Sequence, residues 1–492
     1  MTECFDVAVI GCGPVGATLA NLLERQGRRV VVLDQFVDFY PLPRATHMDG
    51  EAVRILQSAG IMDEMDPRLG IYSRMRFEDA QGRLLIDWPR PTAPGMHGWR
   101  DSNRFHQPDL ETALRDRIAR SPLIDLRLGW RVTALRQDEE AVTIEAARPD
   151  GSTDTVRARY LVGCDGARST VRGAIGADLT TLAASEQWLV ADLILHPHAP
   201  DLPEGTVQYC DPARPFTYIE AVGRRRRWEV MLLPGDDPQT FADPAQVWPL
   251  LARWLSPQDA EIERSVVYTF NSTIASHWRR GRMMIAGDAA HQTPPFLGQG
   301  LCAGLRDAAN LAWKLAWVLD GRAAPALLDS FEGELAPHVT QYIMEANRIG
   351  AIIQERDEAR AQARNAALQA NPQVLAPIRP RLGGDGGLGQ DAPRAGTLAP
   401  QPRLADGRLL DDAVGPRFAL LARDADVLRV SAATRADWAR ADVVVLEGEA
   451  LDQLDELGCN AMLIRPDHYI LGTAQTADDL AALTRRLPLT PA

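Results

Sequence analysis

Residues 6–35 read DVAVIGCGPVGATLANLLERQGRRVVVLDQ. Residues 7–10 form a short apolar run typical of a buried strand, and residues 29–33 form a second such run. The stretch between them contains three glycines, followed by apolar residues at helical spacing. A strand, a glycine-rich turn, a helix and a second strand predict the first βαβ unit of an α/β domain.

Each glycine of this turn has its own expected role. Gly11 allows a tight turn, Gly13 lets the backbone approach a pyrophosphate, and Gly16 lets the helix pack closely against the strand. Asp34 ends the second strand, 18 positions after Gly16, where its carboxylate is placed to accept hydrogen bonds from an adenosine ribose. The helix N-terminus offers free N–H groups to the phosphates. The stretch therefore predicts a dinucleotide site but does not separate NAD from FAD.

Composition narrows the class of protein. The chain has 492 residues, of which 46% are hydrophobic, and its net charge of −13 argues against a surface for nucleic acid or anionic membrane. No cationic leader or long apolar span is evident, so we expect a cytoplasmic protein with no membrane partner. The six cysteines are scattered without a CxxC pair, and we expect neither a disulfide framework nor a metal site.

Two later motifs extend the nucleotide reading. YLVGCDGARSTVR (160–172) predicts a strand, a turn with Asp165, and a helix with basic residues. GRMMIAGDAAHQTPPFLGQGLCAGLRDAANLAWKLAWVLDG (281–321) predicts a strand that leads to Asp288, a loop with two prolines, and a Gly-Gln-Gly turn (298–300) before a long helix. A helix N-terminus stabilises a ring that becomes anionic on reduction, so the second motif suits a redox cofactor.

In this order and at this spacing, the three motifs resemble class A flavoprotein monooxygenases with the p-hydroxybenzoate hydroxylase fold. The resemblance extends through about residue 350 and thinly to the end of the chain. It implies a bound FAD, NADH or NADPH as a transient co-substrate, and hydroxylation of a phenolic ring by molecular oxygen through a C4a-hydroperoxyflavin. Several stretches are similar to the 3-(3-hydroxyphenyl)propionate hydroxylase branch: PRATHMDGEAVRILQSAGI (43–61), QPDLE (107–111), EQWLVADL (186–193), CDPARPF (210–216), RRWEVMLLPG (226–235), HQTPPFLGQG (291–300) and RDAANLAWKLAWVL (306–319).

The resemblance also implies which residues meet the cofactor. Arg44 and Gln107 match cofactor contacts of the family, and Asp165 is tied there to both FAD and pyridine-nucleotide handling. Asp288 would meet the ribityl chain or the pyrophosphate, and the loop 295–301 would lie along the isoalloxazine ring. The expected cofactor-binding residues are Gly11, Gly13, Gly16, Asp34, Arg44, Gln107, Asp165, Asp288, Gly298, Gly300 and Leu301.

The group that takes the phenol proton stays open. His47 and His291 are candidates because histidine has a suitable pKa, and a purely structural histidine is the alternative for each. Tyr218 is a third candidate. Pro295, in the Pro-Pro-Phe stretch, is expected to shape a dry wall for the oxygen reaction.

The substrate is less well defined than the cofactor. The branch resemblance favours 3-(3-hydroxyphenyl)propionate or a related phenolic acid, whose carboxylate Arg214 or Arg100 could bind in a bidentate pair; the sequence does not choose between them. One alternative is a tailoring hydroxylase of an aromatic polyketide or another phenol. An alternative of another class is a non-catalytic flavin-binding protein.

The cofactor motifs lie far apart, so the FAD-binding domain is expected to be discontinuous. Strand patterns between the motifs suit a sheet-rich substrate domain, with the run Arg224–Arg227 at a solvated hairpin turn. The C-terminal part is expected to be thioredoxin-like and, without CxxC, to serve packing or assembly such as a homodimer. The expected units are 1–73, 103–180 and 270–370 for FAD; 74–102 and 181–269 for substrate; 371–394 as a linker rich in proline and glycine; and 395–492 for the C-terminal domain.

Overall fold

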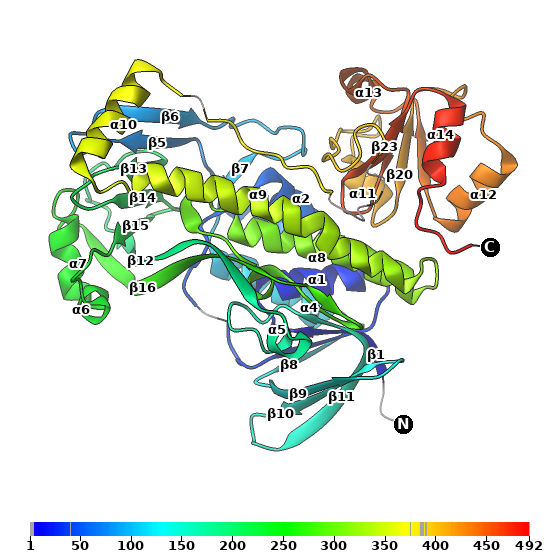
Figure 1. Ribbon diagram of the computed structural model, residues 1–492, viewed down its shortest axis with the longest axis horizontal. Helices are drawn as coiled ribbons and strands as arrows, with labels where there is room; N and C mark the ends of the chain where they lie inside the picture. Colours follow the sequence, from blue (N-terminus) through cyan, green and yellow to red (C-terminus); the bar gives the residue numbers. More distant parts are fainter. Residues whose placement is uncertain (1–3, 40, 374, 384–387, 389–390, 492) are drawn as a thin grey trace.

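The computed structural model describes residues 4–39, 41–373, 375–383, 388 and 391–491. Within them lie two eight-stranded sheets, a four-stranded sheet and a three-stranded sheet, with helices packed among them. Figure 1 shows two long helices, α8 (Gly300–Leu319) and α9 (Ser330–Ile353), crossing the middle of the molecule, with the C-terminal unit beside one end. The α/β class predicted from the sequence is confirmed.

The first eight-stranded sheet contains the glycine-rich βαβ unit. Its centre is parallel, with Val7 opposite both Val30 and Tyr160, so the carboxyl ends of these strands meet at one edge. An antiparallel hairpin extends the sheet beside its long strand. In spatial order the strands are β17 (Arg279–Arg280), β18 (Met283–Ile285), β11 (Thr153–Gly163), β1 (Cys4–Ile10), β2 (Val30–Asp34) and β8 (Ile124–Leu128), with β10 (Val142–Ala147) and β9 (Arg131–Gln137) beyond β11.

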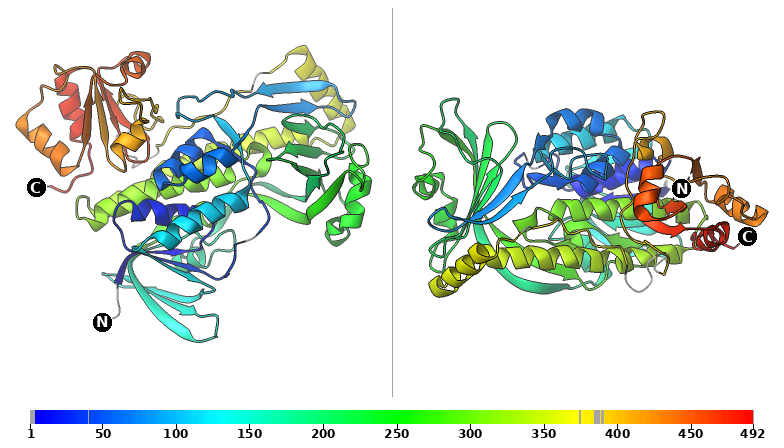
Figure 2. Two further views of the ribbon diagram at one scale, coloured as in Figure 1. Left: turned by 180° about the vertical axis from the view of Figure 1, so that it is seen from behind. Right: turned by 90° about the horizontal axis from the view of Figure 1, so that it is seen from above.

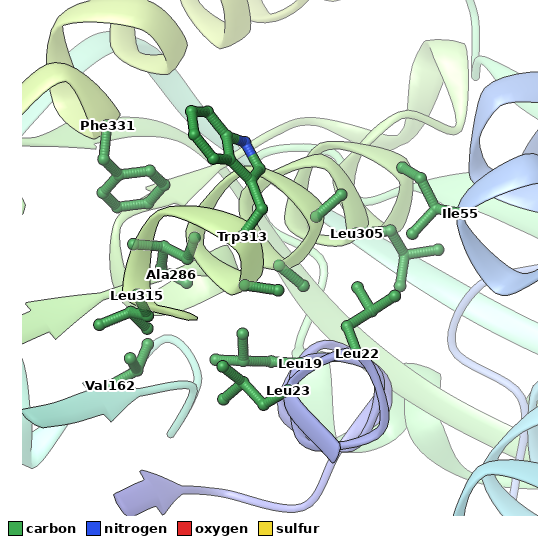
Figure 3. Close-up of a cluster of buried hydrophobic side chains, with 14 of the residues drawn as sticks. Leu19, Leu22, Leu23, Ile55, Val162, Ala286, Leu305, Trp313, Leu315 and Phe331 are labelled. Carbon is green, nitrogen blue, oxygen red and sulfur yellow. The ribbon is translucent and has the colours of Figure 1, made fainter. Parts of the chain in front are cut away.

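The helix that follows the glycine turn, α1 (Pro14–Glu24), packs against α8 in the main core. Pro14 stands at the first helical position, where its missing N–H removes no helical hydrogen bond. Leu19, Leu22 and Leu23 point from α1 towards Leu305 and Leu315 of α8 (Figure 3). This packing fixes the start of α1, and with it the glycine turn, against the sheet.

Most strands of the second eight-stranded sheet come from the stretches 74–102 and 181–269, whose assignment to a substrate domain stays a prediction. Two of its strands are long and cross the expected domain boundaries at 180/181 and 269/270, so the two units are continuous there. Arg224 lies at a turn as expected, but Arg227 does not: it is buried in a strand, so the prediction of a solvated run is wrong for this residue. The strands in spatial order are β19 (His291–Gln292), β16 (Ala260–Ala275), β12 (Leu179–Leu195), β15 (Arg225–Met231), β14 (Phe216–Glu220), β13 (Thr206–Tyr209), β5 (Arg74–Glu78) and β6 (Leu84–Pro89).

The C-terminal unit has the element order βαβαββα around a mixed four-stranded sheet. β20 and β21 are parallel, and β22 and β23 complete the sheet in antiparallel pairs. Figure 2 shows this unit at one end of the long helices, where Phe418 packs against Trp313 and Trp317 of α8. The order agrees with the thioredoxin-like expectation, which remains a prediction. Its strands are β21 (Val444–Glu447), β20 (Ala419–Ala422), β22 (Ala461–Ile464) and β23 (Ile470–Ala474).

The remaining elements are short helices and a small sheet. The small sheet consists of β3 (His47–Asp49), β7 (Ser102–Arg104) and β4 (Gly70–Ile71). The helices are α2 (Gly50–Ala59), α3 (Met62–Met65), η1 (Asp66–Arg68), α4 (Gln107–Arg120), α5 (Thr170–Ile175), α6 (Pro238–Ala242), α7 (Pro244–Leu251), η2 (Gly287–Ala289), η3 (Pro295–Leu297), η4 (Pro325–Asp329), α10 (Glu358–Ala370), α11 (Leu410–Val414), α12 (Ala432–Arg440), α13 (Leu451–Leu457) and α14 (Ala477–Thr484). Among the described residues, no helix has the length and apolar character needed to cross a membrane.

Candidate cofactor and substrate site

A cavity of about 640 Å³ opens at the carboxyl ends of the parallel strands β1, β2 and β11. Its lining includes five of the expected cofactor residues: Gly11, Gly13, Asp34, Arg44 and Asp165. These residues come from four separate stretches of the sequence, and the parallel sheet brings them together. Such an edge is where open α/β sheets bind their ligands.

The three glycines of the turn differ in what surrounds them. A Cβ on Gly16 would lie 2.0 Å from the Gly11 carbonyl oxygen, and one on Gly11 would lie 2.5 Å from that of Cys164. A Cβ on Gly13 would meet no atom within 4 Å, because this residue faces the open cavity at the start of α1. The turn and the helix packing therefore need Gly11 and Gly16, whereas Gly13 leaves room for a ligand. This arrangement fits a pyrophosphate at the helix N-terminus.

Two carboxylates flank the glycine turn. Asp34 accepts hydrogen bonds from the backbone N–H groups of Cys12, at 2.6 Å, and Phe36, at 2.8 Å, which hold it at the end of β2 facing the cavity. Asp165 accepts hydrogen bonds from the Ser169 hydroxyl and from the backbone N–H of Thr170, and so holds the start of α5. Burial raises the pKa of Asp165, while these hydrogen bonds oppose the rise.

One face of α4 lies against residues 44–45, of which Arg44 lines the large cavity. Gln107 accepts hydrogen bonds from the backbone N–H groups of Arg44 and Ala45 and donates one to Glu111 at 2.7 Å. Arg115 donates to the carbonyl oxygen of Cys12, in the glycine turn, and lines the cavity with Glu111. Gln107 itself is 3% exposed, so its observed role is to hold the 44–45 backbone.

The substrate sheet holds the same segment from the other side. Arg227 of β15 pairs with Asp192 of β12 at 2.7 Å and donates hydrogen bonds to the carbonyl oxygens of Pro43 and Arg44. Arg264 of β16 binds the same aspartate at 2.5 Å. The buried charges of the substrate sheet thereby fix the position of a residue that lines the nucleotide cavity.

A second cavity, of about 50 Å³, lies farther along the same segment. Arg44 lines the large cavity, and Thr46 and His47 line the small one, so three residues of backbone connect the two. The small cavity combines apolar and polar groups from the FAD-domain and substrate-domain parts of the chain. Its lining residues are Thr46, His47, Tyr72, Met75, Arg90, Thr206, Gln208, Thr217, Ile219, Glu229, Pro295, Phe296, Leu297 and Gly298.

His47 stands between this cavity and the expected flavin loop. Its Nδ1 lies 3.5 Å from the Gly298 carbonyl oxygen, and its Nε2 lies 3.3 Å from the Ser102 hydroxyl. Burial and the positive charge of Arg90 lower the pKa of His47 to about 4. The imidazole is therefore neutral at pH 7 and can accept a hydrogen bond, but it holds a proton only weakly.

The Gly-Asp loop leads to the N-terminus of α8. The carboxylate of Asp307 accepts hydrogen bonds from the backbone N–H of Gly287 at 2.7 Å and from His291 Nε2 at 2.8 Å. Burial opposes charge on His291, but Asp307 outweighs it and raises the pKa of this histidine. Asp288 is instead exposed to solvent on this loop.

Some predicted residues lie away from both cavities. His291 is 1% exposed and lines neither of them, which gives it a positioning role on the Gly-Asp loop. Tyr218 is fully buried against Trp228 and also lines neither cavity in the described part of the chain. Asp288, Gly300 and Leu301 likewise line neither, although Gly300 begins α8. Their contact with cofactor stays a prediction.

Sequence reasoning missed several lining residues. Glu111 and Arg115 follow Gln107 at successive four-residue steps, and this helical spacing was a usable signal. Arg90, Tyr72 and Glu229 had no such signal, because strand pairing brings them to the small cavity from distant positions.

Comparisons with known proteins agree with this geometry. Residues 4–346 match the family described as FAD binding domain. The chain is 35% identical to a probable NADH-specific resorcinol 4-hydroxylase of Rhodococcus jostii (strain RHA1), over 99% of this chain and 95% of that protein. It is 34% identical to a 3-(3-hydroxy-phenyl)propionate/3-hydroxycinnamic acid hydroxylase of Mycobacterium sp. (strain KMS), over 98% and 83%. The crystal structure of aklavinone-11 hydroxylase with FAD and aklavinone has a similar fold, with a TM-score of 0.81, 24% identity and 99% coverage of both chains.

Proposed function

The chain belongs to the FAD binding domain family, and from that premise we propose that it is an FAD-dependent, NADH-consuming monooxygenase that hydroxylates a single-ring phenol. The observation that carries this proposal is the segment 44–47, which runs from a nucleotide-sized cavity directly to a small cavity with mixed apolar and polar walls. Relatives named as resorcinol and 3-(3-hydroxyphenyl)propionate hydroxylases support the same substrate class. The NADH-specific relative supports NADH over NADPH.

The residues of the large cavity fit FAD. Gly13 leaves space for the pyrophosphate, Asp34 is placed for a ribose, and Arg44 and Arg115 supply positive charge. The N-terminus of α8, at Gly300, is the expected partner of the flavin ring. When bound, FAD supplies the redox chemistry that delivers one atom of molecular oxygen to the phenol ring.

The residues of the small cavity orient the phenol and exclude water. Pro295 and Phe296 form an apolar wall, and Phe296 packs edge-on against Trp188 with ring centroids 5.8 Å apart. With a proton on Nδ1 facing the Gly298 carbonyl oxygen, Nε2 of neutral His47 is an acceptor. Nε2 faces the Ser102 hydroxyl at 3.3 Å, and the phenol hydroxyl would replace that contact. Because the pKa of His47 is about 4, we assign it to orientation rather than to holding the phenol proton.

The size of the small cavity favours a single ring over a polycyclic polyketide. A cavity of about 150 Å³ holds one benzene ring, so at about 50 Å³ the walls must move apart even for a single ring, and much farther for a larger ligand. The ligand named for the structural neighbour is aklavinone. That neighbour is 24% identical and therefore indicates a shared fold only. Hydroxylation of an aromatic polyketide is the alternative substrate assignment.

The test uses purified holoenzyme with its visible flavin spectrum recorded. NADH and NADPH oxidation is followed with resorcinol, with 3-(3-hydroxyphenyl)propionate and with a tetracyclic phenol, and the products are identified by mass spectrometry. We expect a single-ring phenol to accelerate NADH oxidation and to gain one oxygen atom. A protein without bound flavin, or one that inserts oxygen into none of these phenols, would overturn the proposal. The homodimer and the cytoplasmic location stay predictions, for sedimentation and cell fractionation to test.

A further inference from the structure

Arg90 lies at the wall that two cavities share. It lines the small cavity together with Tyr72 and Glu229, and it also lines a neighbouring cavity of about 60 Å³ with Asp101 and Ser102. No sequence motif includes this residue. Its positive charge acts on His47, whose Nδ1 lies 3.5 Å from the Gly298 carbonyl oxygen of the expected flavin loop.

The guanidinium of Arg90 is held in a defined orientation. It stacks on the Trp88 ring, 3.5 Å from the ring centroid, and lies 5.6 Å from the ring centroid of Tyr72. The backbone N–H of Arg90 donates to the carbonyl oxygen of Ser73 at 2.7 Å, and one terminal nitrogen contacts the Ser102 hydroxyl at 3.4 Å. Stacking on an aromatic ring leaves the edge of a guanidinium free for hydrogen bonds in its plane.

The charge of Arg90 is not balanced by an ion pair. Among the described residues, no carboxylate lies within 4 Å of its guanidinium, and its buried Nε has no hydrogen-bond partner. Arg104 pairs with Glu220, and burial raises the pKa of Glu229, which disfavours the charged form of that carboxyl. The titratable and charged groups around Arg90 are Asp101, Tyr72, His47, Glu229 and Arg104. Arg90 is half-buried. Five fully buried arginines, by contrast, each have a carboxylate at 2.5–2.7 Å: Arg54, Arg227, Arg264, Arg306 and Arg465.

We propose that Arg90 binds an anionic oxygen of the substrate, so that it is the residue that selects anionic phenols. The inference rests on the proposed function and deepens it. A desolvated guanidinium with a free edge is a strong partner for a carboxylate or a phenolate oxygen. The two arginines considered from sequence do not serve: Arg214 is paired with Asp236 at 2.6 Å, Arg100 contacts Asn103, and neither lines the small cavity.

The anionic oxygen has two sources, and the choice of probe separates them. 3-(3-Hydroxyphenyl)propionate has a carboxylate and a phenol, its primary amide has the same shape without the carboxylate charge, and resorcinol has phenol groups alone. Binding to holoenzyme is measured from the change in flavin absorbance, and product formation per NADH is measured alongside. The variants are Arg90→Met, Arg90→Lys and, as a matched control outside the cavity, Arg214→Met.

If Arg90 pairs with the carboxylate, Arg90→Met weakens binding of the acid by about 10- to 100-fold and leaves the amide and resorcinol nearly unchanged. If it pairs with the phenolate, all three probes weaken together. Arg90→Lys keeps the charge but cannot form a bidentate pair. We expect its loss of affinity, on a logarithmic scale, to be about one third of the loss in Arg90→Met. The Arg214→Met control leaves all three affinities within about twofold of wild type.

Outcomes for Arg90 and for the enzyme are distinguishable. If wild type hydroxylates a probe and Arg90→Met, with full FAD content, binds and hydroxylates every probe as wild type does, the Arg90 inference is wrong and the proposed function stands. If wild type itself hydroxylates no phenol, the proposed function is wrong. Should Arg90→Met not retain FAD, Arg90→Lys decides: binding equal to wild type for every probe rejects the inference, and selective weakening supports it.

Discussion

A buried arginine lies where α9 meets the C-terminal unit and a half-buried one lies at the wall of the small cavity, and the two differ in how their charge is balanced. At the domain contact, Arg465 donates to both oxygens of Glu334 at 2.7–2.8 Å and to Asp467 at 2.6 Å. Lys314 binds the same glutamate at 2.7 Å. Every charge in this group has an opposite charge within the chain, so it needs nothing from outside.

The cavity wall is arranged differently. Arg90 has an aromatic platform and a hydroxyl contact but no carboxylate partner among the described residues, and the neighbouring glycine turn leaves the space at Gly13 open. A buried charge without an internal partner is costly, and it becomes favourable when a ligand supplies the opposite charge. Buried charges with internal partners therefore join the domains, whereas charge without a partner and unfilled space indicate where ligands bind.

The largest effect is expected at the domain contact. Glu334→Ala leaves Arg465 and Lys314 buried without their shared carboxylate, and we expect a loss of about 3–5 kcal/mol in stability. Thermal unfolding followed by circular dichroism measures it. The control is Glu345→Ala on the same helix, which breaks the more exposed pair with Arg348 and should cost at most about 1 kcal/mol. Equal shifts in the two variants would contradict the assignment of the contact as a compensated structural cluster.

The next effect concerns open space rather than charge. Gly13 has an extended backbone that valine tolerates, and a Cβ there meets nothing, so Gly13→Val should fold normally without cofactor. Its side chain would occupy the space of the pyrophosphate, and we expect FAD affinity to fall at least about 100-fold, or about 2.7 kcal/mol. Flavin fluorescence quenching on titration of apoprotein measures the affinity. Gly173→Val, at an equally open position on α5, serves as the control and should retain near-normal affinity.

A smaller effect is expected at His47, on the catalytic rate. His47→Gln removes the imidazole assigned to orienting the phenol, and we expect hydroxylation to slow about 10- to 100-fold because the ring is positioned less accurately. Because the pKa of His47 is lowered to about 4, the imidazole gains a proton only as the pH falls towards 4. Its protonation therefore causes no change in the hydroxylation rate near pH 6.5. Profiles of product formation from pH 5 to 8 should therefore have one shape in wild type and variant. A step near 6.5 that disappears in His47→Gln would refute this; His198→Gln, on the surface, is the control.

Features of the site that depend on residues close together in the sequence could be predicted, whereas those that depend on strand register could not. The GxGxxG turn and Asp34 were predictable because their roles are set by neighbours within about 30 residues, and the structure places Gly11, Gly13 and Asp34 at one cavity. The pairing of Asp192 with Arg227 was not predictable, because it depends on the register between β12 and β15. A run of arginines then reads as a solvated turn, although the sheet buries one of its members.

The same limit applies to the substrate site. The lining of the small cavity comes from stretches around residues 46, 72, 90, 206–229 and 295, and only the folded sheet brings them together. Periodicity and motif spacing describe single elements, so they identified the ends of strands that hold the nucleotide. They could not show which arginine among many would lack a partner.

The smallest predicted effect tests whether the compensated cluster of the substrate sheet also positions the cofactor segment. Arg227 and Arg264 both bind Asp192, but only Arg227 is seen to donate to the carbonyl oxygens of Pro43 and Arg44. Arg227→Lys keeps the charge and loses this fork, and we expect FAD affinity to fall about 3- to 10-fold, or about 1 kcal/mol. Arg264→Lys is the matched control and should change FAD affinity by less than about twofold. Equal weakening by both variants would show that the charge of the cluster, and not the hold on the 43–44 backbone, supports cofactor binding.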